Sequence, residues 1–210
     1  MPTRKTKKPQ TKDKGKSDKR DQCQTPYYAL DLILPWLPQF DGLTIWEPAT
    51  GQGMMVDRLV FKGHQVLGTD LLTGSNYFDF QPHDYGVQVT NPPYSVKYEW
   101  LERAYHLGKP FALLMPIDVM GAATAQRLFS EYGVQIILMD KRIDFYMPNK
   151  GFKKGGSPFA SAWYTWKFNL PDQINYATIT QYPNEQISLF DTMIPGGIAV
   201  ELPQMEMSFE

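Results

Sequence analysis

The chain of 210 residues has little of what several protein classes need. Its single cysteine, Cys23, excludes an internal disulfide and offers no thiolate cluster, so we expect no metal site. No apolar run approaches the roughly eighteen residues of a transmembrane helix, and no apolar stretch follows the basic N-terminus as in a secretory signal. We therefore expect a cytoplasmic protein with no membrane partner.

Net charge is also nearly absent, at −1, but its distribution is uneven. Residues 1–20 hold nine Lys and Arg against two Asp, which gives +7 there and −8 in the remainder. With almost no apolar side chains to bury, this part cannot offset the entropy of ordering, and the sequence predicts a disordered basic arm over 1–22. Such an arm attracts nucleic-acid phosphates irrespective of base sequence, with Lys5, Lys7 and Lys8 as contacts. A solubilising tail or a localisation signal is the alternative.

Strand and helix patterns alternate through the middle of the chain. The expected strands are 44–47, 65–70, 86–90, 110–116, 134–139 and 160–168, and the expected helices are 54–62, 97–107 and 122–132. An earlier helix begins with Thr25 as its cap and Pro26 in first position, and ends or kinks near Pro35. This alternation predicts an α/β domain over 23–169, with a mostly parallel sheet between helices. Residues 170–210 read as an irregular extension with one or two short strands.

The most informative segment is the tetrapeptide Asn91-Pro92-Pro93-Tyr94, which follows a short apolar strand. Two prolines fix φ and remove two donors, so the segment is a stiff corner at a strand end. It presents an amide side chain, a free carbonyl at Pro92 and an aromatic ring. These groups can hold an exocyclic amino group on a planar heterocycle. Alone, the motif is more often a plain turn, so its neighbours matter.

Three further features stand at strand ends. Gly51 and Gly53 form a turn into a helix, where a ligand can approach the backbone, although the spacing of a dinucleotide fingerprint fails at Val56. Asp70 ends the second strand and can accept hydrogen bonds from both hydroxyls of a ribose. Asp79 and Phe80 pair a carboxylate with a ring, as adenine binding requires. Because parallel strands end at one edge, we expect a shared crevice.

Together these motifs resemble the class I S-adenosylmethionine-dependent amino-methyltransferases of DNA, in particular small phage-type N6-adenine enzymes, over residues 25–168. The resemblance implies a Rossmann-like fold and S-adenosylmethionine as the cofactor. It makes Asn91, Pro92, Pro93 and Tyr94 the catalytic residues. The cofactor residues that it implies are Thr25, Pro26, Tyr27, Glu47, Pro48, Ala49, Thr50, Gly51, Gly53, Asp70, Leu71, Asp79, Phe80 and Asn91.

The implied reaction is direct methyl transfer to a flipped adenine, with Asn91 and Pro92 accepting the amine hydrogens and Tyr94 stacking on the base. Segments 142–145 and 157–162 resemble a closing segment of the phage-type enzymes, although Asp144 departs from their usual residue. Little chain is left for a recognition domain. The basic glycine-rich loop 147–156 could supply contacts through Lys150, Lys153 and Lys154, with Arg142 beside it, or be a plain hairpin loop. Sequence specificity is then relaxed, or comes from a partner or a homodimer.

Two alternatives stay open. The tetrapeptide also occurs in methyltransferases of ribosomal RNA and of protein glutamine, and the basic arm favours nucleic acid without separating DNA from RNA. The other alternative is a non-catalytic methyltransferase-like subunit that binds nucleic acid for a partner.

Overall fold

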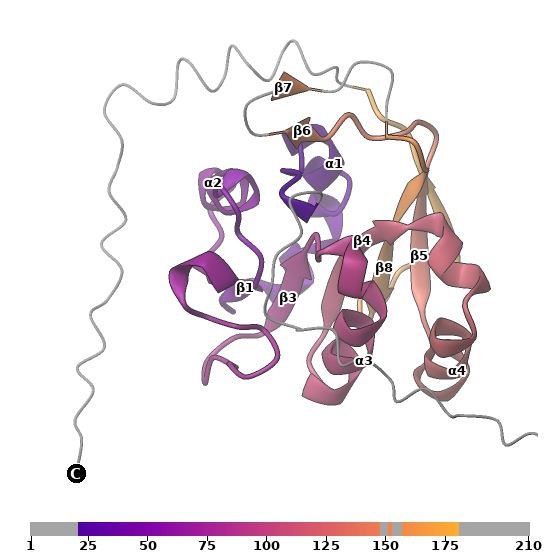
Figure 1. Ribbon diagram of the computed structural model, residues 1–210, viewed down its shortest axis with the longest axis horizontal. Helices are drawn as coiled ribbons and strands as arrows, with labels where there is room; N and C mark the ends of the chain where they lie inside the picture. Colours follow the sequence, from indigo (N-terminus) through magenta and orange to yellow (C-terminus); the bar gives the residue numbers. More distant parts are fainter. Residues whose placement is uncertain (1–20, 148–150, 153–156, 181–210) are drawn as a thin grey trace, which may run out of the picture.

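The computed structural model describes residues 21–147, 151–152 and 157–180, and a seven-stranded sheet lies at its centre (Figure 1). The sheet consists of β1 (Ile45–Glu47), β2 (Val66–Gly68), β3 (Val87–Thr90), β4 (Phe111–Pro116), β5 (Gln135–Met139), β8 (Ser161–Trp166) and β9 (Ile174–Ala177). The helices are α1 (Tyr27–Asp31), α2 (Met54–Phe61), α3 (Lys97–Leu107) and α4 (Ala123–Tyr132). A separate hairpin pairs β6 (Tyr146–Met147) with β7 (Gly151–Phe152). No helix in these described ranges is long and apolar enough to cross a membrane.

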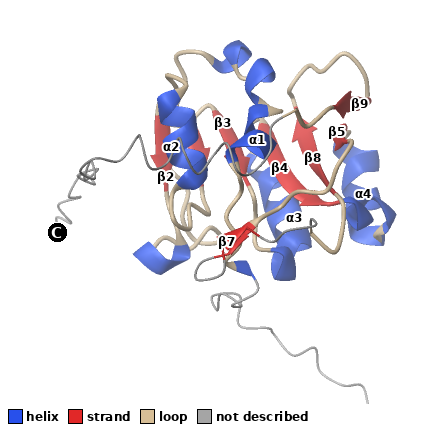
Figure 2. Cartoon of the chain, turned by 90° about the horizontal axis from the view of Figure 1, so that it is seen from above, coloured by secondary structure: helices blue, strands red, loops and turns tan. Residues whose placement is uncertain are grey.

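The strand order is β2-β1-β3-β4-β8-β5-β9, and the labelled strands follow it across Figure 2. β1 pairs in parallel with β2 and β3, and β3 with β4, whereas β8 runs antiparallel to both β4 and β5. The chain reverses its direction across the sheet between β1 and β3, which is where open sheets of this kind bind ligands. The predicted α/β fold class, a mostly parallel Rossmann-like sheet with helices on both faces, is confirmed.

Alternation along β4 explains how both faces of the sheet are covered. Ala112 and Leu114 belong to the core that α1 and α2 complete, whereas Phe111, Leu113 and Met115 belong to the core under α3 and α4. Because every side chain of this strand is buried, its sequence is a nearly continuous apolar run. A third cluster of Trp46, Tyr77, Tyr85 and Trp100 packs beyond β1, towards the edge where the site lies.

The segment before β1 differs from the helix predicted there. α1 ends at Asp31, and two 3-10 turns follow at Leu34–Trp36 and Pro38–Phe40, each with a proline in its first positions. Proline has no N–H with which to continue an α-helical ladder, so the chain turns instead. The predicted cap is wrong, because Pro26 is the capping residue and Thr25 is buried one position earlier.

The extension after β8 contributes to the same core as far as it is described. β9 pairs in parallel with β5, opposite Ile136 to Met139, and provides one of the short strands expected there. Leu170 and Ile179, on either side of it, are buried in the main cluster. Residues 170–180 therefore add an edge strand and apolar cover to the sheet.

Candidate functional site

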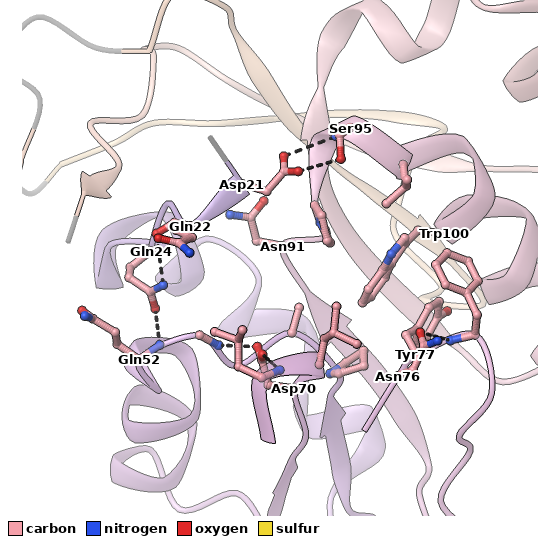
Figure 3. Close-up of a pocket in the computed structure, with 18 residues that line it drawn as sticks. Asp21, Gln22, Gln24, Gln52, Asp70, Asn76, Tyr77, Asn91, Ser95 and Trp100 are labelled. Atoms are coloured by element: carbon pink, nitrogen blue, oxygen red, sulfur yellow. Dashed lines mark hydrogen bonds between the residues drawn. The ribbon is translucent and has the colours of Figure 1, made fainter. Parts of the chain in front are cut away.

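A cavity of about 240 Å³ lies at the carboxyl ends of β1, β2 and β3 (Figure 3). Its lining comes from the segment before α1 (Asp21, Gln22, Gln24), from the turns after β1 (Pro48, Ala49, Gly51, Gln52) and β2 (Asp70, Leu71, Leu72), from Asn76, Tyr77 and Phe78, and from the region after β3 (Asn91, Pro93, Ser95, Val96, Trp100). The predicted crevice thus joins the turn of residues 48–53, called the glycine turn below, to the tetrapeptide.

The N–H groups of Gly51, Gln52 and Gly53 in the glycine turn all donate hydrogen bonds within the protein. Gly51 N–H donates to Asp70 Oδ2 at 2.9 Å, Gln52 N–H to Gln24 Oε1 at 2.8 Å, and Gly53 N–H to the Thr50 carbonyl at 2.8 Å. Both glycines have positive φ, +53° and +89°, a region that side chains with a Cβ rarely adopt. Because these N–H groups already have acceptors, the turn does not offer the free amides with which helix N-termini bind phosphate.

Asp70 lies where the ribose-binding acid was predicted. Its Oδ1 accepts the Leu72 N–H at 2.8 Å, and its Oδ2 accepts the Gly51 N–H. A carboxylate has about four acceptor positions, so capacity for a diol remains. Among the described residues, the lining contains the charged side chains Asp21 and Asp70 and no Lys, Arg or His. The cavity therefore favours a ligand with a positive charge and disfavours phosphates.

Asn91 is half-buried at the end of β3 and lines the cavity. Its Oδ1 is buried and has no hydrogen-bond partner among the described residues. Leaving such an acceptor unsatisfied costs about 1–3 kcal/mol, so an amide kept there indicates a partner that arrives with a ligand. Pro93 also lines the cavity, whereas Pro92 is buried behind it.

Tyr94 points into an aromatic cluster rather than into the cavity. Its ring contacts Phe145 at 6.3 Å and Phe159 at 5.5 Å between centroids, both edge to face. Burial raises the pKa of the Tyr94 hydroxyl, which the Ser161 hydroxyl beside it partly opposes. Phe159 is 36% exposed, so one ring of this cluster reaches the surface. Base stacking by Tyr94 remains a prediction.

Glu47 lies behind the cavity and not in its lining. It is fully buried, and its Oε1 accepts the Ala49 N–H at 2.9 Å and the Thr90 hydroxyl at 2.6 Å. Burial raises the pKa of this carboxyl to about 8, more than its hydrogen bonds from Thr90 and Ala49 lower it. At neutral pH the Glu47 carboxyl is therefore mostly uncharged, because burial disfavours the charged form.

The predicted adenine contact is displaced. Asp79 accepts the Asn76 side-chain amide at 2.6 Å, Phe80 packs edge to face on Trp46 at 6.4 Å, and neither residue lines the cavity. Residues 76–80 form a turn, and Asn76, Tyr77 and Phe78 line the cavity in place of Asp79 and Phe80. Tyr77 stacks on Trp100 with centroids 3.8 Å apart, which gives this end a flat aromatic wall.

The predicted contacts from the start of α1 are displaced as well. Thr25 and Tyr27 are buried, with Arg58 5.4 Å from the Tyr27 ring centroid, and neither they nor Pro26 line the cavity. Thr50 and Gly53 likewise shape the glycine turn without lining the cavity, whereas Pro48, Ala49, Gly51, Asp70 and Leu71 do line it.

The residues that replace Thr25 to Tyr27 are 21–24, which we call the strap. Asp21 accepts the Ser95 hydroxyl at 2.6 Å, and in Figure 3 it lies beside Asn91, while Gln24 reaches Gln52 on the other side. Gln24 also exchanges two backbone hydrogen bonds with Tyr146 of β6. The sequence carries no signal for the strap, because its partners are long-range and its polar residues match no motif.

The predicted nucleic-acid contacts are described only in part. Arg142 is exposed, and its Nη1 donates to the Ser157 carbonyl at 3.4 Å. The other predicted contacts, Lys5, Lys7, Lys8, Lys150, Lys153 and Lys154, lie outside the described residues.

Three solved structures are similar to this chain. The methyltransferase subunit of a type I restriction-modification system from Streptococcus thermophilus has 14% identity and a TM-score of 0.49, over 75% of this chain and 47% of that one. A predicted O-methyltransferase from Agrobacterium tumefaciens has 12% identity and a TM-score of 0.41, over 73% and 85% of the two chains. A proposed RNA methyltransferase from Pyrococcus horikoshii has 13% identity and a TM-score of 0.40, over 66% and 81%.

The chain thus spans less than half the length of the Streptococcus structure. No protein-family model matches the chain, and the comparison with curated proteins gives no match. At these identities and TM-scores, none of the similarities assigns a substrate or an activity to this chain.

Proposed function

We propose that this chain transfers a methyl group from S-adenosylmethionine to the N6 amino group of adenine in DNA. The observation that carries the proposal is the buried Oδ1 of Asn91, which has no hydrogen-bond partner in the part of the chain that the structure describes and lies at a corner fixed by two prolines in an acidic cavity. An acceptor without a donor fits a substrate that brings N–H groups, and an exocyclic amine brings two.

The cavity suits S-adenosylmethionine better than a dinucleotide. The paired amides of the glycine turn leave no phosphate cradle, and the two lining carboxylates favour a cation. Asp70 would hold the ribose hydroxyls, and the apolar wall of Leu71, Phe78 and Trp100 would hold the adenine ring. When bound, the cofactor supplies a methyl group on a positively charged sulfur, which an amine nitrogen can take directly with release of one proton.

The tetrapeptide would prepare the acceptor nitrogen. The lone pair of an adenine amine is delocalised into the ring, which makes it a weak nucleophile. Hydrogen bonds to Asn91 Oδ1 and to the Pro92 carbonyl would favour a pyramidal nitrogen and stabilise the charge that develops on it. The protein would then need no covalent intermediate, because positioning supplies much of the rate.

Two features support a nucleobase as the acceptor. Tyr94, three residues after Asn91, belongs to an aromatic cluster with Phe145 and the partly exposed Phe159, on which a flipped base could stack. The basic residues 1–20 give the chain a sequence-independent attraction for phosphates.

The test uses the full chain with S-adenosylmethionine that carries a deuterated methyl group. Separate reactions contain DNA, RNA or a protein extract, and each product is digested for mass spectrometry. The proposal expects labelled N6-methyldeoxyadenosine, absent from reactions with Asn91→Ala. Label in RNA adenosine or in protein glutamine would move the proposal to that substrate. Cofactor binding by calorimetry without transfer to any pool would indicate a non-catalytic subunit, and no cofactor binding would overturn the proposal.

A further inference from the structure

One buried carboxyl oxygen, Glu47 Oε1, accepts hydrogen bonds from both the glycine turn and the end of β3, which precedes the tetrapeptide. Glu47 ends β1 and Thr90 ends β3, and neither side chain has any exposed surface. The two strands pair in parallel, with Ile45 opposite Val87 and Trp46 opposite Gln88. Beyond the last pair, the Thr90 hydroxyl donates to Glu47 Oε1 at 2.6 Å, and the Ala49 N–H donates to the same oxygen at 2.9 Å.

One donor lies in the glycine turn, and the other lies next to the tetrapeptide. Ala49 is in the glycine turn and lines the cavity, whereas Thr90 directly precedes Asn91. The prolines at 92 and 93 fix the backbone on the far side of Asn91. Thr90 is β-branched, and its χ1 is restricted further by the hydrogen bond, so the backbone on the near side is fixed as well.

We propose that Glu47 and Thr90 are positioning residues that set the distance between the glycine turn and the acceptor amide of Asn91. This inference rests on the proposed function and gives Glu47 a role different from the cofactor contact that its motif implies. Transfer depends on the separation of the two reactants, and a misplacement of about 1 Å can cost about 100-fold in rate. A rigid link between the glycine turn and Asn91 would therefore hold the two reactants at the separation that transfer requires.

The uncharged state of Glu47 agrees with this role. Its Oε2 is buried and has no hydrogen-bond partner among the described residues, and burial raises the pKa of the carboxyl to about 8. A charged group would cost more to bury, whereas a neutral carboxyl still accepts two hydrogen bonds at one oxygen. Glu47 thus acts as a fixed acceptor for its two neighbours.

The experiment removes the Thr90 hydroxyl and keeps its shape. Thr90→Val is compared with Thr165→Val, because Thr165 is also fully buried and donates to the Gln135 carbonyl at 3.0 Å on a strand outside the cavity lining. We expect Thr90→Val to lower kcat for methyl transfer by about 10- to 100-fold. Cofactor Kd should change by less than about 3-fold, because no lining group is removed. Thr90→Ser, which keeps the hydroxyl, should recover most of the rate.

Both valine variants should lose similar Tm, since each loses one buried hydrogen bond. A loss of kcat no larger in Thr90→Val than in Thr165→Val would overturn the inference. A loss of cofactor affinity in Thr90→Val as large as its loss of kcat would also overturn the inference, because Glu47 and Thr90 would then act in cofactor binding.

A second measurement is independent of activity, so failure of the proposed function is distinguishable from failure of this inference. Nitrogen relaxation of the Asn91 side-chain amide should show a larger amplitude of motion in Thr90→Val than in wild type or Thr165→Val. An unchanged amplitude would overturn the positioning role even if wild-type protein methylates none of the substrate pools.

Discussion

The two sides of the cavity differ in how completely their polar groups are satisfied. On the glycine turn, the N–H groups of Gly51, Gln52 and Gly53 all have acceptors within the protein. At the tetrapeptide, Asn91 Oδ1 is buried without a partner among the described residues. One side is therefore complete before a ligand binds, and the other is completed by it. Under the proposed function, this difference would separate a scaffold that binds the cofactor from a group that acts on the acceptor.

Replacing Asn91 should have the largest effect and should act on transfer alone. We expect Asn91→Ala to lower kcat by about 100- to 1,000-fold, because it removes an acceptor for developing charge. Cofactor Kd should stay within about 3-fold, and Tm should be unchanged or slightly higher, because an unsatisfied buried group is lost. Single-turnover kinetics and calorimetry would measure the two quantities.

Asn91→Asp sharpens this test because it keeps an acceptor oxygen. It should retain more activity than Asn91→Ala. Equal activities, or lost cofactor binding in either variant, would contradict the role of Asn91 as an acceptor for the amine.

Replacing Asp70 should have the opposite profile. Asp70→Ala removes the acceptor of the Gly51 and Leu72 N–H groups as well as a contact predicted for the cofactor. Charge-assisted hydrogen bonds contribute about 1.5–3 kcal/mol, so cofactor Kd should rise by about 10- to 100-fold in calorimetry. Asp41→Ala, at an exposed position with the same change in charge, is the control. Similar affinities of the two variants would place the cofactor elsewhere.

A Cβ at Gly51 should disturb the strap rather than the fold. It would lie 2.3 Å from Gln24 Nε2, whereas a Cβ at Gly42 would meet nothing within 4 Å, and both glycines have positive φ. Gly51→Ala and Gly42→Ala should therefore share a backbone cost of about 1 kcal/mol in urea unfolding. Only Gly51→Ala should weaken cofactor binding, by about 3- to 10-fold, because Gln24 loses its bond to Gln52. Identical cofactor affinities would show that the strap does not close on the ligand.

Glu47 should also give the protein a pH dependence of stability. Its pKa of about 8 is above its ordinary value of 4.5, so between these values the folded protein holds a proton that the unfolded chain has released. The stabilisation is complete below about pH 4.5 and declines as pH rises towards 8. Glu47→Gln cannot titrate, so urea midpoints of wild type should fall relative to those of Glu47→Gln over this window. Parallel curves would mean that Glu47 is charged when buried.

Local patterns account for the predicted site residues that the structure places in the cavity lining. The tetrapeptide and the glycine turn are set by proline and glycine, whose backbone preferences act within a few residues, and Asp70 follows directly from a strand end. Asp79 and Phe80 were displaced because the direction of their side chains depends on packing against Trp46 and Asn76. The strap was missed because Asp21 and Gln24 find their partners at Ser95 and Gln52.

The sequence alone determined the alternation of strands and helices, the stiff corner at Asn91 and the acidic residue at the end of β2. These follow from side-chain periodicity and backbone restriction, which are properties of neighbouring residues. The tertiary structure alone decided that β8 enters between β4 and β5, that Glu47 is buried outside the cavity lining, and that residues of the strap line the cavity. Each of these depends on contacts between distant segments, whose free energy is defined only when the whole core is packed.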